Sequence, residues 1–240
     1  MAVRRGTATP SAIFRGTVPV QKVMRGTVEV WSAGPPYYAA FNSGALYANS
    51  GSRGGQFSPV GAGVTAAPIG VNVAANAYMN YVHSGPTLDG LTLAGWIKSS
   101  GTSSDEVAAW GTNYPSADHY LWLSHNPSSK GRSLTAVLSG SASISTPVGS
   151  APAGTWLHVA ARYQQTGTDR NLRVYIGGQL AAETTQPGGP LNMDGKPVWF
   201  GGREGNARWA GTIDKWRAWD KPIDPAEIAA IYNAEKSQHP

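Results

Sequence analysis

The segment Leu91-Thr92-Leu93-Ala94-Gly95-Trp96-Ile97-Lys98 is the clearest indication of the fold, because apolar residues or glycine occupy every second position of it. Alternate residues of a strand point to the same face, so this period of two predicts a strand with one face in the core. The core face carries Leu91, Leu93, Gly95 and Ile97, and the opposite face carries Thr92, Ala94, Trp96 and Lys98.

Further strands are predicted on both sides of this segment. Leu172, Val174 and Ile176 repeat the alternation, opposite Arg173 and Tyr175. We also expect strands at residues 77–83, 106–110, 119–124, 134–139, 156–163, 179–184 and 198–201. A content of 30 Gly, 17 Pro and only 14% charged residues suits short strands joined by tight turns. The sequence therefore predicts an all-β fold, a two-sheet antiparallel jelly-roll sandwich.

One short helix is predicted near the C-terminus. Asp224 is a suitable N-cap, Pro225 suits the first helical position, and Glu227 completes an acidic capping pattern. The apolar face of the helix is formed by Ile228, Ile231 and Tyr232. We expect this helix to pack on the sandwich and close it.

Several buried roles follow from residue type. We expect Trp96, Trp156 and Trp216 between the two sheets, because large aromatic rings fill the centre of such sandwiches. His158 lies in an apolar strand and is expected to be a sheet histidine whose ring is satisfied by hydrogen bonds, not a ligand. Gly177-Gly178 predicts a hairpin turn that requires positive φ.

The N-terminus carries a repeat with a spacing of ten residues, Arg5-Gly6-Thr7, Arg15-Gly16-Thr17 and Arg25-Gly26-Thr27. Each unit predicts a short β segment, a glycine turn and a second β segment, which cannot bury a core alone. We therefore expect residues 1–32 to be an extended docking arm that pairs with another protein, and a disordered basic tail is the alternative. The expected docking residues are Arg5, Phe14, Arg15, Arg25, Val28, Val30 and Trp31.

Charge and composition change along the chain. Five basic residues and one acidic residue give the first thirty residues a net charge of +4, out of +5 for the chain. This stretch has no helical face or stacking platform, so we expect an acidic protein surface as its partner and no nucleic acid. Residues 33–65 are rich in Gly, Ser, Ala and Pro with scattered aromatic residues, which predicts a linker that lies against the domain; a solvated linker is the alternative. Residues 66–240 remain for the sandwich.

Several segments resemble, in order, the strands of laminin-G-like domains, which are similar to the concanavalin A-like lectins. They are residues 77–82, 91–98, 156–160, 172–178, 200–202 and 211–219, followed by the helix start at 223–228. The resemblance implies a jelly roll that binds a ligand without catalysis. It also implies that Asp214 has no catalytic role, and we expect its carboxylate to bond backbone in the last strand.

The N-terminal repeat, which ends in Val28-Glu29-Val30-Trp31, resembles the N-terminal segments of phage tail and other virion proteins. This resemblance implies a virion structural protein, a minor tail or tail-tip protein, made in the host cytoplasm and displayed on the tail or capsid surface. With the lectin-like domain, the expected function is adhesion to a host-surface glycan. A capsid decoration or stabilising protein that binds no sugar is the alternative. No apolar run approaches the length of a membrane span, so we expect no membrane insertion.

The sequence predicts neither an enzyme nor a cofactor. Retaining glucanases of this fold use a Glu-x-Asp-x-x-Glu pattern, which is absent, and the adjacent Asp105 and Glu106 point to opposite faces of a strand. The five His residues have no metal-site spacing, and there is no Cys. A calcium ion at the rim is the alternative, with oxygen donors from Asp105, Asn113, Asp118 and Asn126.

One loop combines aromatic rings with hydrogen-bonding side chains, as a sugar site requires. The expected glycan-binding residues are Trp110, Asn113, Tyr114, Asp118 and Tyr120, with Arg208 and Trp209 adjoining them. The same residue types occur at contacts between subunits, which is the alternative. Because one weak sugar site gives little attachment, we expect a homo-oligomer whose copies raise avidity.

Overall fold

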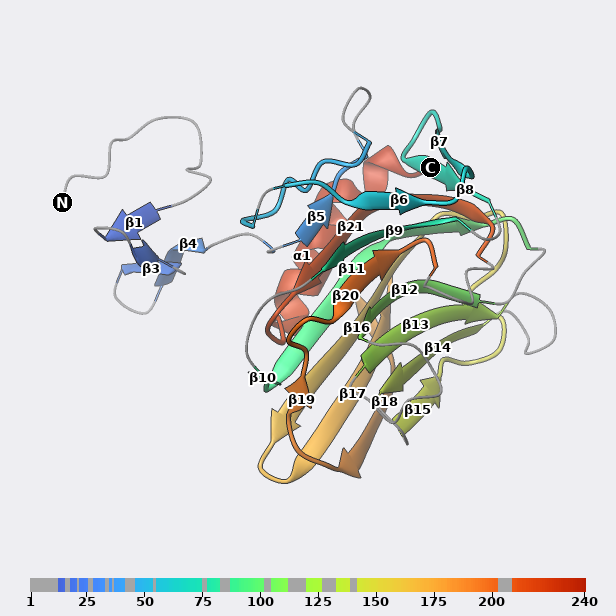
Figure 1. Cartoon of the computed structure of the whole chain (residues 1–240). Helices are drawn as coiled ribbons and strands as arrows, with labels where there is room; N and C mark the ends of the chain where they lie inside the picture. The colour runs from blue at the N-terminus through green and yellow to red at the C-terminus, as the bar shows by residue number, and fades with distance from the viewer. Residues whose placement is uncertain are drawn as a thin grey trace.

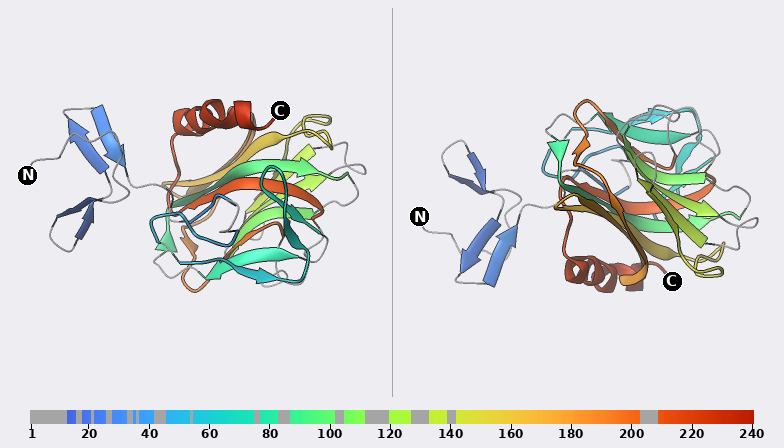
Figure 2. Two further views of the ribbon diagram at one scale, coloured as in Figure 1. Left: turned by 90° about the horizontal axis from the view of Figure 1, so that it is seen from above. Right: turned by 90° about the horizontal axis from the view of Figure 1, so that it is seen from below.

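The structure is a computed structural model of the chain. It describes residues 13–15, 18–20, 22–25, 28–32, 35, 37–41, 46–53, 55–74, 77–82, 87–101, 105–111, 120–126, 133–138, 142–202 and 209–240. Within these residues no helix is long and apolar enough to cross a membrane. The described strands form two large antiparallel sheets packed face to face, and helix α1 lies outside one of them (Figures 1 and 2).

The described strands of the larger sheet number eight, and those of the other number seven. The eight-stranded sheet has the order β18 (Gln179–Pro187), β17 (Asp169–Ile176), β16 (Leu157–Thr166), β11 (Gly90–Ser99), β21 (Gly211–Trp219), β8 (Val71–Val73) and β7 (Val64–Ala66), with β5 (Tyr37–Ala39) also paired to β21. The seven-stranded sheet has the order β15 (Ala142–Ser145), β14 (Ser133–Leu138), β13 (Tyr120–Asn126), β12 (Asp105–Gly111), β20 (Pro197–Phe200), β9 (Tyr78–Val82) and β6 (Ser58–Val60). A separate short ladder joins β10 (Thr87–Leu88) to β19 (Leu191–Asn192).

This arrangement confirms the predicted jelly-roll sandwich. Each expected strand is present, with its ends shifted by three residues or fewer. Leu91, Leu93 and Ile97 of β11 point into the core between the sheets, as the alternation predicts. Gly177 and Gly178 join β17 to β18 with φ values of 57° and 75°, so the predicted turn is also confirmed.

Strand β21 contains a β-bulge opposite Gly95 of β11. The register shifts between Ala94 and Trp96, so that Lys215 and Trp216 together stand opposite Gly95 alone. Lys215 has a left-handed backbone, with a φ of 50°. The extra residue turns Trp216 inward, where its side chain is fully buried. A Cβ atom on Gly95 would stand 2.5 Å from the Trp216 ring, so glycine allows this ring to lie against the backbone of β11.

Helix α1 (Pro225–Glu235) and the 3-10 turn η1 (Lys236–Gln238) lie on the outer face of the eight-stranded sheet (Figure 2). The Asp224 carboxylate accepts a hydrogen bond from the Ala226 amide at 2.7 Å, which confirms the predicted N-cap. The helix packs on the sheet through apolar contacts. They involve Ala94, Ala160, Tyr175, Trp219, Ile223, Ile228 and Ile231.

Polar contacts fasten the end of α1 to the same sheet face. Glu235 accepts a hydrogen bond from Trp96 Nε1 at 2.8 Å and forms a buried salt bridge with Arg217. The Nε2 atom of His239 lies 2.8 Å from Oδ2 of Asp214, and the His239 ring stacks on Trp96 with centroids 4.0 Å apart. We call Trp96, Asp214, Arg217, Glu235 and His239 the C-terminal clasp.

Three expectations about individual residues need correction. Trp216 lies between the sheets as expected, but Trp96 lies on the outer face under α1, and Trp156 is half-buried with its ring edge-on to His239. The helix supplies the cover that the second sheet was expected to provide. The Asp214 side chain bonds the His239 ring, not the backbone of its own strand.

The segment expected to be a linker, residues 33–65, contributes strands to both sheets. β5 pairs with β21, and β6 pairs with β9. Tyr37, Phe41 and Phe57 are buried in the core, where burial of large aromatic side chains contributes to stability. The sandwich in the described residues therefore begins at β5 and not at residue 66.

The N-terminal residues form two hairpins, β1 (Ile13–Arg15) with β2 (Val18–Val20) and β3 (Lys22–Arg25) with β4 (Val28–Ser32). Among the described strands, these pair only with each other (Figure 1). Arg5 lies outside the described residues. The other expected docking residues lie in these strands, but their side chains are not described: Phe14, Arg15, Arg25, Val28, Val30 and Trp31. The docking role stays a prediction.

Replacing Gly95 by Ala should destabilise the sandwich, because the added methyl group would overlap the Trp216 ring. We expect the free energy of unfolding to fall by about 1 to 3 kcal/mol, as for other overpacked cores. Urea unfolding measures this. Gly189→Ala is the matched control, since nothing lies within 4 Å of a Cβ there, and it should change little. Equal stability of the two variants would contradict the role of Gly95.

Acid should destabilise the protein through His158, which is buried where α1 packs on the sheet. Burial, together with the smaller effects of the charges of Arg217 and His239, lowers the pKa of His158 to about 4, while Glu235 acts to raise it. The unfolded chain binds this proton near pH 6.5, whereas the folded chain does not bind it until about pH 4, so stability is lost as the pH falls through this window.

The measurement is urea unfolding of the wild type and of His158→Gln near neutral pH and at about pH 4.5. Between these pH values His158 should remove about 2 kcal/mol of unfolding free energy from the wild type. The variant should lack this part of the loss, while the other titrating groups act equally in both proteins. The same loss in both proteins would mean that His158 is not held neutral by the fold.

Candidate functional site

Two of the aromatic rings expected to stack on a sugar belong to the core. Trp110 and Trp209 are fully buried. The Trp110 ring packs edge-on against Tyr37 with centroids 5.4 Å apart, and the Trp209 ring packs edge-on against His125 at 5.8 Å. This corrects the expectation for both rings, because an enclosed ring has no free face for a ligand.

The other expected glycan-binding residues are not tested by the structure. Asn113, Tyr114, Asp118 and Arg208 lie outside the described residues. For Tyr120, only its position at the start of β13 is described. The loop site therefore remains a prediction without its two tryptophans.

The described residues contain no group of three His, Asp or Glu side chains placed to bind a metal ion. Of the calcium donors considered from the sequence, Asp105 begins β12 and Asn126 ends β13. The other two, Asn113 and Asp118, lie outside the described residues.

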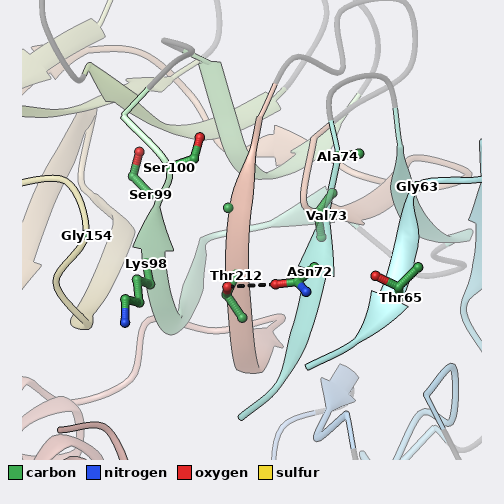
Figure 3. Close-up of a pocket in the computed structure, with 11 residues that line it drawn as sticks. Gly63, Thr65, Asn72, Val73, Ala74, Lys98, Ser99, Ser100, Gly154 and Thr212 are labelled. Carbon is green, nitrogen blue, oxygen red and sulfur yellow. Dashed lines mark hydrogen bonds between the residues drawn. The ribbon is translucent and has the colours of Figure 1, made fainter. Parts of the chain in front are cut away.

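A groove on the eight-stranded sheet brings together polar side chains from four strands (Figure 3). Thr65 of β7 pairs in register with Asn72 of β8, Asn72 pairs with Thr212 of β21, and Thr212 pairs with Lys98 of β11. Residues directly opposite one another on adjacent strands have neighbouring side chains on one face. We call these four residues the polar row.

The polar row faces outward because its neighbours in the chain face the core. Those neighbours are Val64, Val71, Val73, Ile97 and Ile213, all of them buried between the sheets. Since alternate residues of a strand point to opposite faces, the row lies on the outer face of the sheet. Its threonine and asparagine on β7 and β8 are exposed, and its residues on β21 and β11 are half-buried.

The groove has a volume of about 580 Å³, and Ser99, Ser100 and Gly154 also line it. Thr212 Oγ1 donates a hydrogen bond to Asn72 Oδ1 at 3.0 Å, which turns the Asn72 NH₂ group away from Thr212. The row thus offers hydroxyl, amide and ammonium groups, which are the donors and acceptors that bind sugar hydroxyls. None of the described residues that line the groove is Asp or Glu.

A smaller pocket of about 160 Å³ lies between α1 and the sheet, lined by residues that include Trp96, Trp156, His158 and Tyr232. Both ring nitrogens of His158 are buried and have no hydrogen-bond partner among the described residues. His158 is therefore buried in the sheet as expected, but the expectation that its ring is satisfied by hydrogen bonds is wrong. The His239 ring covers the Trp96 ring. We therefore assign this pocket to the contact between α1 and the sheet, and not to an open binding surface.

The polar row was missed in the sequence because its members come from segments that are far apart. The alternation in 91–98 assigns Lys98 to the outer face, and it was the one available signal. Thr65, Asn72 and Thr212 stand in strands whose pairing order no local pattern reveals. Only the register of β7, β8 and β21 brings them to the same line.

Solved structures of similar fold include several binding domains. Domain 4 of AbnA, a GH43 extracellular arabinanase from Geobacillus stearothermophilus, in complex with arabinotriose, has a TM-score of 0.62 at 14% identity, and the match covers 83% of this chain and 98% of that one. A heptameric SAP-like pentraxin from Limulus polyphemus has a TM-score of 0.53 at 17% identity, with 72% of this chain and 81% of that one covered. At these identities the likeness shows the fold.

The receptor-binding region of botulinum neurotoxin is also similar. The structure of neurotoxin type C, which interacts with two ganglioside molecules, has a TM-score of 0.60 at 12% identity, with 84% of this chain and 51% of that one covered. The present chain thus corresponds to about half of that structure. No curated protein sequence matches the chain. The family model of the concanavalin A-like lectin/glucanases superfamily matches residues 73–229, so this chain belongs to that superfamily.

Proposed function

We propose that this chain is a non-enzymatic carbohydrate-binding domain for adhesion to a host-surface glycan, and that the polar row binds the sugar. The observation that carries the proposal is the line of hydrogen-bonding side chains across four strands, open to solvent in a groove. The superfamily supports it, as do the arabinotriose complex and the ganglioside-binding neurotoxin among the similar structures.

The dimensions of the row suit a short oligosaccharide. Adjacent strands are about 4.8 Å apart, so four strands span about 14 Å. The hydroxyl and amide groups of the row can replace water on sugar hydroxyls, directly or through bridging water molecules. A shallow groove with few contacts predicts weak binding at each site.

Residue types in the groove favour binding over hydrolysis. Most glycoside hydrolases place two carboxyl groups on either side of the scissile bond. The described residues that line the groove include no carboxylate. A substrate held by the row would meet no general acid from these residues.

We further propose that residues 1–32 attach the domain to a phage particle, as a minor tail or tail-tip protein on the tail or capsid surface. The two hairpins support a β-structured arm, since short isolated hairpins are marginal in water and gain stability by adding strands to a partner. A capsid decoration or stabilising protein that binds no sugar is the second candidate. The β-structured arm supports this second candidate, which does not need the groove to bind a ligand.

We expect the chain to act as a homo-oligomer, because several weak sites on one particle raise avidity. The similar pentraxin is heptameric, which supports this expectation. Light scattering of the full chain checks this expectation, and a monomer at all concentrations would contradict it.

Removing polar groups from the row should weaken glycan binding without unfolding the protein. We expect the double variant Asn72→Ala, Thr212→Val to bind about tenfold or more weakly, since each lost hydrogen bond contributes about 1 kcal/mol. A glycan array followed by calorimetry on the full chain measures this. Both residues lie on the outer face, so the urea midpoint should hardly change.

The matched control is Tyr114→Ala, Asp118→Ala, which alters the loop expected from the sequence. It should bind like the wild type. If the loop variant loses binding and the row variant retains it, the sugar site is the loop. If no glycan binds the wild type, the decoration or stabilising role is the better account.

Deleting residues 1–31 should abolish incorporation into particles and leave a folded sandwich, because β5 and all later strands remain. Quantitative blotting of purified particles measures incorporation, and circular dichroism checks the fold. A variant in which Arg5, Arg15 and Arg25 are replaced by neutral residues tests whether incorporation depends on the charge of the arm or on its β structure. Normal incorporation of the deleted chain would refute the docking role.

A further inference from the structure

We propose that the groove selects an acidic saccharide, with the Lys98 ammonium group paired to a carboxylate of the sugar. This inference rests on the proposed function of the polar row and names the class of sugar that it binds. It follows from the charges on the outer face and from the position of Lys98 in the row.

Lys98 is the charged residue among the described residues that line the groove. It stands at the end of the polar row on β11, beside Thr212 of β21 (Figure 3). Its side chain is half-buried, and Ser99 and Ser100 line the same groove. A cation bordered by neutral hydrogen-bonding groups matches a sugar that carries one negative charge among several hydroxyls.

The other cations near the clasp already have partners. Arg217 is paired with Glu235, Lys215 Nζ donates to Gln238, and Lys236 Nζ donates to Asn233 at 3.0 Å. For Lys98, no hydrogen bond or salt bridge is formed with the described residues. The positive charge of Lys98 is therefore available to a ligand.

The nearest carboxylate on the same strand as Thr212 is also engaged. The Asp214 carboxylate bonds the ring of His239 at 2.8 Å. The Asp214 carboxylate is therefore part of the C-terminal clasp and does not neutralise the charge of Lys98. The described residues that line the groove have a net positive charge. An acidic sugar complements this charge, whereas a neutral sugar leaves the ammonium group without a counter-charge.

The test compares matched saccharides on the full chain. The probes are oligosaccharides of galacturonate and mannuronate, and sialyl-lactose, each beside its carboxyl-reduced neutral counterpart. We expect at least one acidic member to bind the wild type about tenfold more tightly than its neutral counterpart, because a hydrogen bond to a charged group is worth more than a neutral one. Added salt should reduce this preference.

The variant Lys98→Gln should bind acidic and neutral members of each pair equally. Lys221→Gln is the matched control, because it removes the same charge beside Thr92, about 20 Å along β11 from Lys98, and it should keep the preference. A wild type that binds neutral members as tightly as acidic ones overturns this inference alone. So does a preference that persists in Lys98→Gln. Absence of binding to every saccharide of a wider array overturns the proposed function itself.

Discussion

The β-bulge of β21 opposite Gly95 determines which side chains of this strand enter the core and which face outward. Without the extra residue, the period of two along β21 would send Trp216 and Ile213 to opposite faces. With it, both residues enter the core, while Asp214, Arg217 and Trp219 face outward. Glycine at the facing position lets the Trp216 ring approach the neighbouring backbone. One local irregularity thereby fills the sandwich and prepares its outer face for a helix.

The outer face is divided into a covered part and an open part. The C-terminal clasp and the apolar face of α1 cover the middle strands, where Arg217 and Glu235 satisfy each other in a buried pair. Moving either partner away would leave a buried charge without compensation. This cost holds the C-terminal end of α1 at the clasp. Beyond it, toward β7 and β8, no described helix lies on the sheet. The polar row occupies this open part, and its strands are rigid because the core beneath them is packed.

Much of the fold could be predicted from the sequence, and the site could not. The alternation in 91–98 and the N-cap at Asp224 depend on neighbours in the chain, so local patterns revealed them. Trp110 illustrates the limit: a ring next to a polar loop looked like a sugar platform, although the strand period turns it into the core. Asn72 and Thr212 meet only through pairing of distant strands. The polar row is a property of register, and register is set by the whole sandwich.

The proposed binding site for the sugar is the polar row. The most direct measurement is a titration of the isotope-labelled full chain with a bound oligosaccharide, followed by amide chemical shifts in solution. We expect the largest shifts on β7, β8, β21 and the end of β11, at Thr65, Asn72, Thr212 and Lys98. Shifts confined to the loop between β12 and β13, with the four strands unchanged at saturation, would contradict it.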